Sequence, residues 1–207
     1  MRFTTRRASL FILLGGLALA AGCSRSWETA YTPLEGAADS YKLAGVSVIV
    51  PQSLTVSESE TSYVPKADIV WVEEPAGDRR AQVARIFEEG VRAGASGLRG
   101  ATPVTIEVTV QKFHALNMKS RYNAPQGTGV YDITFTARIL DTASGAELVP
   151  TQQILANAPA RTGDAALAEE AAGITQRSTN VAQIAATIAG WLRVGPDNRT
   201  TFRRLGG

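Results

Sequence analysis

The stretch from residue 103 to 111 constrains the fold more than any other feature, because apolar and polar side chains alternate along it. Successive residues of a β-strand point to opposite faces of the sheet, so this alternation predicts one buried and one solvated face. The buried face carries Val104, Ile106, Val108 and Val110. A sheet with such a face needs other elements to cover it.

Further strands are expected on both sides of this one. Residues 130–140 alternate in the same way, and residues 147–157 form the next run. The sequence DTASG at 141–145 has the composition of a tight turn, so these three strands should form an antiparallel meander. Two shorter runs at 46–50 and 68–73, each followed by a proline, predict two more strands.

Two amphipathic helices are predicted from apolar residues that recur every three to four positions. The first begins after Asp78, whose carboxylate can accept the backbone amide hydrogens of the first turn. Val83, Phe87 and Val91 form its apolar face. The second lies within residues 164–194, a stretch that is rich in alanine and that Gly173 interrupts or weakens.

The order of these elements predicts an α+β fold. We expect a mostly antiparallel sheet of four to five strands, with the two amphipathic helices packed on one of its faces. This domain would span residues 43–195, a length for which a single core suffices. Residues 196–207 are polar and rich in arginine, and we expect them to form a disordered tail.

The N-terminus has the features of an export signal. Three arginines lie within the first seven residues, and an apolar stretch at 10–21 is shorter than the ~20 residues that span a bilayer. We therefore assign residues 1–22 to a signal peptide rather than to a cytosolic helix. The arginine pair partly resembles a twin-arginine signal, but Ser9 stands where phenylalanine is usual, so the general secretion route is preferred.

The signal ends at Leu19-Ala20-Ala21-Gly22-Cys23, which resembles the lipobox of bacterial lipoproteins. In that motif the cysteine thiol receives a diacylglyceryl group, and cleavage before the cysteine frees an amine that is often acylated. Ordinary signal-peptide cleavage is the alternative, and it would leave an unpaired thiol near the new N-terminus. The resemblance implies lipid attachment at Cys23.

Residues 23–42 are expected to be a lipidated tether, because they mix turn-forming residues with scattered apolar ones. Trp27 and Tyr31 either lie at the membrane surface, as amphipathic aromatic residues do, or are incidental to a disordered linker. Ser24 resembles the residues that permit transport to the outer membrane in enteric bacteria. The expected location is the periplasmic side of the envelope, at the outer rather than the inner membrane.

Charge and cysteine content narrow the possible partners. Without residues 1–22, the 21 Lys and Arg residues of the chain fall by three to 18, against 19 Asp and Glu residues. This balance does not indicate nucleic-acid binding, which usually needs a basic face. Cys23 is the only cysteine, so no disulfide can form within one chain. With one histidine and scattered acids, the sequence predicts no metal site and no cofactor.

A polar cluster after the strand at 103–111 is the candidate contact surface for a partner. It combines positive side chains, the only histidine and an aromatic ring of the kind favoured at interfaces. Its members are Lys112, His114, Lys119, Arg121 and Tyr122. The competing interpretation is structural: His114 would bond to backbone at the end of a strand, and the following residues would form an ordinary solvated loop. For His114 itself this structural role is preferred.

Several short motifs resemble an uncharacterised family of Gram-negative bacterial lipoproteins. They are YVPKADIVW at 63–71, GDR at 77–79, QV at 82–83, FHAL at 113–116 and RY at 121–122. The resemblance covers most of residues 40–195 and implies no known activity and no catalytic residues. The order of elements is also distantly similar to that of envelope assembly and transport-auxiliary lipoproteins, which is a likeness of fold alone.

Together these features predict a non-enzymatic lipoprotein that binds an envelope protein or a lipid. Anchoring raises the local concentration of the domain at the membrane, so a weak contact can suffice. The alternative is a hydrolase of envelope polymers that uses His114. A deep pocket that gathers His114 with acids or a serine would favour the hydrolase.

Overall fold

The computed structural model describes residues 24–205, so the expected signal peptide and Cys23 lie outside the described residues. The described part contains nine strands, five α-helices and one short 3-10 helix. The strands are β1 (Ser24–Ala30), β2 (Tyr41–Ile49), β3 (Val56–Ser57), β4 (Ile69–Val70), β5 (Thr102–His114), β6 (Val130–Asp141), β7 (Glu147–Ala156), β8 (Ala158–Pro159) and β9 (Thr200–Leu205). The helices are α1 (Ala37–Ser40), α2 (Arg79–Gly94), η1 (Ala95–Gly97), α3 (Met118–Asn123), α4 (Asp164–Ala171) and α5 (Gln176–Trp191).

The predicted antiparallel meander forms the centre of the sheet. β5 pairs with β6 and β6 pairs with β7, both antiparallel, with Val108 opposite Ala137. The turn after β6 is closed by Asp141, whose Oδ1 accepts hydrogen bonds from the backbone N–H groups of Ala143 and Ser144. Alternate residues of β5 and β6 are fully buried, as the alternation in the sequence predicts.

The sheet as a whole is mixed rather than purely antiparallel, and its nine strands exceed the four to five that the sequence predicts. Its strand order is β3-β4-β5-β6-β7-β1-β9, with β2 also paired to β5 and β8 to β6. β2 and β4 both run parallel to β5. The reason is α2, which lies between these strands and β5 in the chain and crosses over the sheet, so the next strand enters in the same direction.

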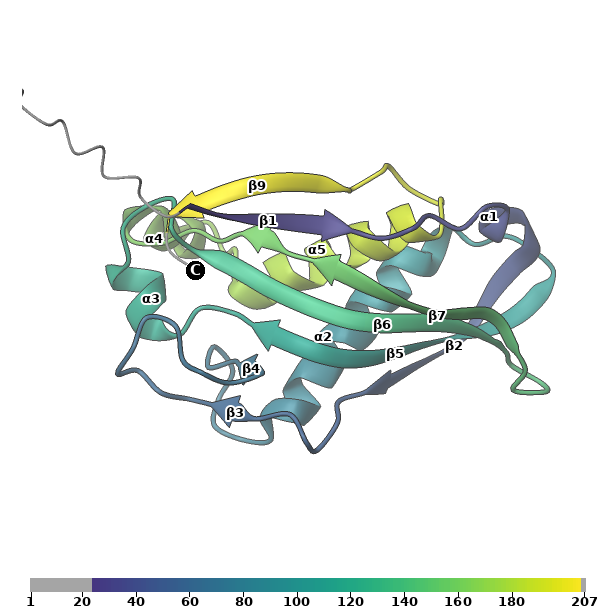
Figure 1. Ribbon diagram of the computed structural model, residues 1–207, viewed down its shortest axis with the longest axis horizontal. Coiled ribbons are helices and arrows are strands. Elements are labelled where there is room, and N and C mark those ends of the chain that lie inside the picture. Colours follow the sequence, from purple (N-terminus) through teal and green to yellow (C-terminus); the bar gives the residue numbers. More distant parts are fainter. Residues whose placement is uncertain (1–23, 206–207) are drawn as a thin grey trace, which may run out of the picture.

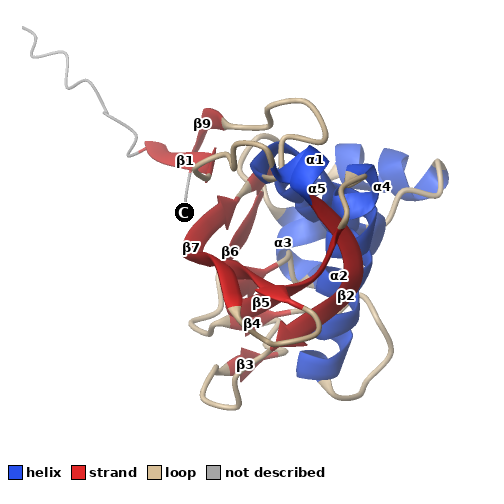
Figure 2. Cartoon of the chain, turned by 90° about the vertical axis from the view of Figure 1, so that its right-hand side faces the viewer, coloured by secondary structure: helices blue, strands red, loops and turns tan. Residues whose placement is uncertain are grey.

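The two predicted amphipathic helices pack against each other on one face of the sheet (Figure 2). Asp78 caps α2 as expected, with its Oδ1 accepting from the N–H groups of Arg80 and Ala81. The second helical stretch is interrupted at Gly173, as the sequence predicts: α4 and α5 lie on either side of this residue, whose φ is 75°. The helices approach closely at Gly90, where a methyl group would lie 2.7 Å from Cγ2 of Ile184.

The core lies between these helices and the sheet. Phe87 of α2 packs edge-on against Phe135 of β6, with ring centroids 5.2 Å apart, and against Phe113 of β5 at 6.0 Å. Trp71, which follows β4, also packs edge-on against Phe113, with ring centroids 5.8 Å apart. All four side chains are fully buried, so the apolar faces of α2 and the meander are those that the sequence predicts.

The expected tether and the expected disordered tail are both ordered strands. β1 and β9 pair antiparallel from Ser24 opposite Leu205 to Thr29 opposite Thr200, and they extend the sheet beyond β7 (Figure 1). Trp27 and Tyr31 are buried, so neither a membrane-surface position nor a disordered linker describes them. Tyr31 holds the start of the C-terminal segment, because its hydroxyl donates a hydrogen bond to Asp197 and accepts one from the backbone N–H of Asn198.

The folded domain therefore begins at residue 24 rather than at residue 43, and it includes the C-terminal strand. Within the described residues, no helix combines the length and the hydropathy that a membrane span requires.

Candidate functional site

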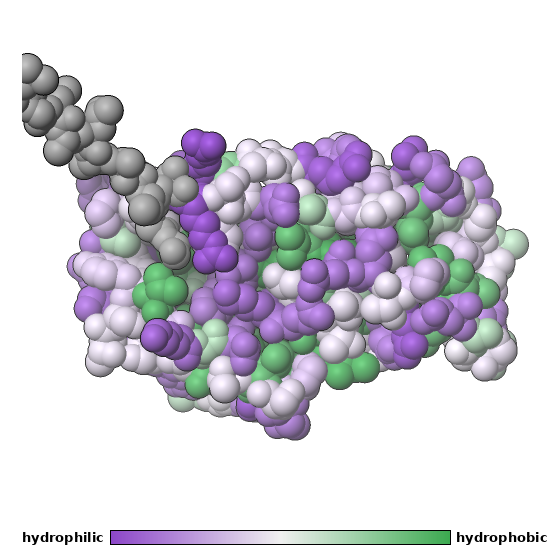
Figure 3. Space-filling view, viewed as in Figure 1, coloured by the Kyte–Doolittle hydropathy of each residue, from purple (hydrophilic) through white to green (hydrophobic). Residues whose placement is uncertain are grey.

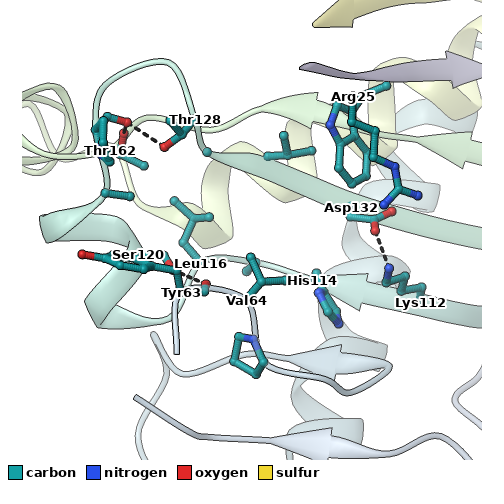
Figure 4. A pocket seen from close by; sticks show the side chains of 17 residues that line it. Arg25, Tyr63, Val64, Lys112, His114, Leu116, Ser120, Thr128, Asp132 and Thr162 are labelled. Carbon is teal, nitrogen blue, oxygen red and sulfur yellow. Dashed lines mark hydrogen bonds and ion pairs between the residues drawn. The ribbon is translucent and has the colours of Figure 1, made fainter. Parts of the chain in front are cut away.

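A pocket opens at the end of the molecule where β1 begins and β5 ends (Figure 4). Its volume is about 290 Å³, close to the lower limit for small-molecule sites. Five segments that are far apart in the sequence build it: the start of β1, residues 63–65, the end of β5 with the two residues after it, the stretch from α3 to the start of β6, and Thr162 after β8. The apolar side chains that line it include Trp27, Val64, Pro65, Leu116, Ala124 and Val130.

One wall of the pocket carries an ion pair between neighbouring strands. Lys112 of β5 lies with its Nζ 2.5 Å from Oδ2 of Asp132 on β6. The register of the meander explains the pair, because Asp132 stands directly opposite His114, two residues from Lys112. Arg25 also lines the pocket, and its guanidinium stacks 4.6 Å above the ring of Trp27.

His114 lies at the end of β5, in the pocket, and has a structural partner. Its Nε2 donates a hydrogen bond to the backbone carbonyl of Ala67, in the segment just before β4. Burial lowers the pKa of the imidazole below its ordinary value, because the charged form loses hydration there. The preferred interpretation of the sequence, a strand-end histidine bonded to backbone, is confirmed.

The rim formed by residues 59–63 is fixed in place by α3. Asn117 donates from Nδ2 to the carbonyls of Ser59 and Ser62, at 2.7 and 2.9 Å. The Ser120 hydroxyl donates to the carbonyl of Tyr63. Glu60 accepts hydrogen bonds from the first N–H groups of α3. The backbone of this rim is therefore hydrogen-bonded to α3 and its N-cap, although its side chains reach solvent.

The five residues of the predicted contact surface do not form one patch. Lys112 and His114 line the pocket, and Lys119 lies on its outer rim, with Nζ 5.0 Å from the ring centre of Tyr63. Arg121 and Tyr122 point instead toward α4, where both hydrogen-bond to a carboxylate oxygen of Glu170 at 2.8 and 2.7 Å.

Arg121 corrects the expectation most clearly, because its side chain is only 1% exposed. A buried guanidinium cannot offer its charge to a partner at the surface. Its role is structural: the hydrogen bonds from Arg121 and Tyr122 hold the pKa of Glu170 below its usual value, which ties α3 to α4.

The pocket gathers three residue types that a hydrolase could use, His114, Ser120 and Asp132. Among the hydrogen bonds of residues 24–205, none joins any two of them. Each is bonded elsewhere: His114 to Ala67, Ser120 to Tyr63 and Asp132 to Lys112. No group of three or more His, Cys, Asp or Glu side chains in the described part of the chain is arranged to hold a metal ion.

Sequence reasoning did not find Arg25, Trp27, Val64 or Asp132 as pocket residues. Asp132 could have been found, since the predicted meander places β6 beside β5 and a charge opposite the strand end. The other three come from segments without a clear strand pattern, and only the long-range pairing of β1 brings the first two to the pocket.

The fold and site together define a class: a single α+β domain with helices on one face of a mixed sheet and a mainly apolar pocket at one end. Residues 41–207 match the model of DUF6778, a family of unknown function, and the chain belongs to that family. The match confirms the expected membership in an uncharacterised family. No curated protein matched the chain in a sequence comparison.

Several solved structures are similar to this chain at low sequence identity. A DUF330 protein from Xanthomonas campestris has a TM-score of 0.43 and 16% identity, over 79% of this chain and 91% of that one. A candidate lipoprotein from Caulobacter crescentus CB15 has a TM-score of 0.36 and 14% identity, over 72% and 90%. PelC from Paraburkholderia phytofirmans, a dodecamer, has a TM-score of 0.31 and 13% identity, over 80% and 97%. Likeness at this level says nothing about activity.

Proposed function

We propose that this protein is a lipid-anchored component of the cell envelope, attached to the membrane through Cys23, whose pocket binds another envelope component without catalysing a reaction. The lipobox-like end of the export signal supports the anchor. Ser24 supports the outer membrane, with the domain on its periplasmic side. The partner is an envelope protein or a lipid that presents an apolar group.

The observation that carries the binding role is the state of the polar groups in the pocket. His114, Ser120 and the Lys112–Asp132 pair are each satisfied by a structural partner. What remains for a ligand is mainly apolar surface, and burial of apolar surface is the main source of affinity in such sites.

Crosslinking in cells tests the binding role directly. A photoreactive amino acid at Ala124, which lines the pocket, should give crosslinked adducts with a defined partner. The matched control is the same substitution at Leu148, an exposed apolar residue of β7 far from the pocket. Adducts at equal yield from both positions, or from neither, would contradict the proposal.

The hydrolase alternative keeps one observation in its favour, the presence of His114, Ser120 and Asp132 in one pocket. It predicts that the purified protein releases soluble fragments from envelope polymers such as peptidoglycan. The release would have to disappear in His114→Gln and Ser120→Ala variants that keep the wild-type melting temperature. We expect no release from any of the three proteins.

A further inference from the structure

We infer that the end of the domain that carries the pocket rests on the lipid bilayer, with Tyr63 and Val64 inserted at the level of the lipid headgroups. This end, called the anchor end below, consists of residues 24–27, residues 59–66 and α3. The inference rests on the proposed lipid at Cys23, and it adds an orientation and a second membrane contact to the anchor.

The chain between the proposed lipid and the folded domain is short. Cys23 directly precedes Ser24, which is already paired with Leu205 in the sheet. One residue spans at most ~3.3–3.6 Å, so a lipid on Cys23 would hold the start of β1 within a few ångströms of the bilayer surface. The long tether that would let the domain turn freely is a strand instead.

The anchor end exposes large apolar side chains. Val64 is 62% exposed and Tyr63 49%, and Val64 is the most exposed large apolar side chain in residues 24–205. Met118, the first residue of α3, adds a third exposed apolar side chain at 44%. Figure 3 shows apolar surface at this end of the molecule. Tyrosine is well suited to the headgroup region, since one end of its ring is apolar and the other is polar.

Basic side chains accompany these apolar ones at the anchor end. Arg25, Lys66 and Lys119 belong to the anchor end, and none of them forms an ion pair within the span that the structure describes. Glu60 is the acid within residues 59–66, and its carboxylate accepts hydrogen bonds from the backbone N–H groups of Met118 and Lys119. Basic side chains beside exposed apolar ones fit an anionic membrane surface.

The rim is also prepared for insertion. Asn117 and Ser120 hold the backbone of residues 59–63 by three hydrogen bonds. Tyr63 and Val64 therefore stay exposed without a loss of order on binding, which lowers the entropic cost of the contact. The same geometry turns the mouth of the pocket toward the membrane, because both residues line it.

The test places a fluorescent reporter on the rim of the full-length, lipidated protein. Val64→Trp is compared with Leu148→Trp, whose side chain is 40% exposed on β7 at the other end of the molecule. Each is reconstituted in anionic vesicles whose acyl chains carry bromine, which quenches tryptophan at short range. Wild-type protein gives the background of Trp27, Trp71 and Trp191, all buried.

We expect quenching of the added tryptophan to be several-fold stronger in Val64→Trp than in Leu148→Trp. Tyr63→Trp provides a second reporter, so that a folding defect in one variant does not decide the result. Equal quenching at both ends would overturn the orientation, and would leave this rim to a protein partner. Intact mass separates the two levels: protein without lipid overturns the anchor and the orientation together, whereas lipidated protein with an unquenched rim overturns the orientation alone.

Discussion

Arg121 is the residue whose role differs most between sequence and structure, whereas His114 has the structural role that the sequence favours. Both were candidate contacts for a partner, and both have structural hydrogen bonds. His114 still lines the pocket, whereas Arg121 is enclosed between α3, α4 and the sheet. Residue type and position along a strand predicted polar chemistry here, but burial decided how that chemistry is used.

The lowered pKa of His114 predicts how stability depends on pH. Burial lowers the folded-state pKa below the ordinary value of 6.5, so the unfolded chain takes up a proton more readily than the folded one. The stability that neutral His114 contributes is therefore fully present above pH 6.5, and it is lost as the pH falls toward the folded-state pKa. We expect the free energy of unfolding by urea to fall less between pH 7 and pH 5 in His114→Gln than in wild type. An identical slope in both proteins would show that His114 titrates normally.

The pair of Arg121 and Glu170 predicts a larger effect than a surface ion pair. Glu170→Ala leaves a buried guanidinium without its carboxylate, which should lower the free energy of unfolding by about 2–4 kcal/mol. Glu88→Ala is the matched control, because Glu88 pairs with Arg92 on the exposed face of α2 and should contribute less than about 0.5 kcal/mol. Similar losses in the two variants, measured by urea unfolding, would contradict the structural role of Arg121.

At the scale of elements, local patterns predicted what local physics controls. The alternation at 103–111 and at 130–140 and the helix after Asp78 were found from the sequence, because burial of one face imposes a period on the chain. The direction of β2 and β4 relative to β5 was not predicted, since short strands carry no signal of their partners. β1 and β9 were not predicted for the same reason, since both join the sheet only through long-range pairing.

The predicted core gives a direct test of the element faces. Val108 and Phe87 are fully buried between the sheet and α2. Val108→Ala and Phe87→Ala should each lower the free energy of unfolding by about 2–5 kcal/mol, with the larger loss for Phe87, because each removes apolar contacts and leaves a cavity. Two variants that melt within a degree of wild type would show that these faces are assigned wrongly.

Truncation tests whether the C-terminal segment is an ordered strand or the disordered tail that the sequence predicts. Removal of residues 197–207 deletes β9 and the two hydrogen bonds of the Tyr31 hydroxyl. We expect a loss of at least about 1–3 kcal/mol, since Tyr31 is left buried without partners. Thermal melting of the truncated and full chains measures it, and an unchanged melting temperature would restore the view of an independent tail.

At the scale of the whole molecule, the features that support the proposed function lie together at one end. The start of β1, the pocket and the exposed side chains Tyr63 and Val64 lie there. The sequence predicted a lipid anchor, and its candidate contact residues Lys112 and His114 line the pocket. It could not predict the pocket itself, because five distant segments build it and no local pattern records that they meet.

The most direct test of the central claim is the fate of the protein when Cys23 is replaced. Wild-type protein should be found in the membrane fraction, with an intact mass equal to the chain from Cys23 plus its lipid. Cys23→Ala should be released from the membrane or retain its signal peptide, because the variant has no thiol to carry lipid. Two or more acyl chains anchor a protein firmly, and the variant lacks them all. Cys23→Ala protein in the membrane fraction, with the same processed, lipid-bearing mass as wild type, would contradict the account.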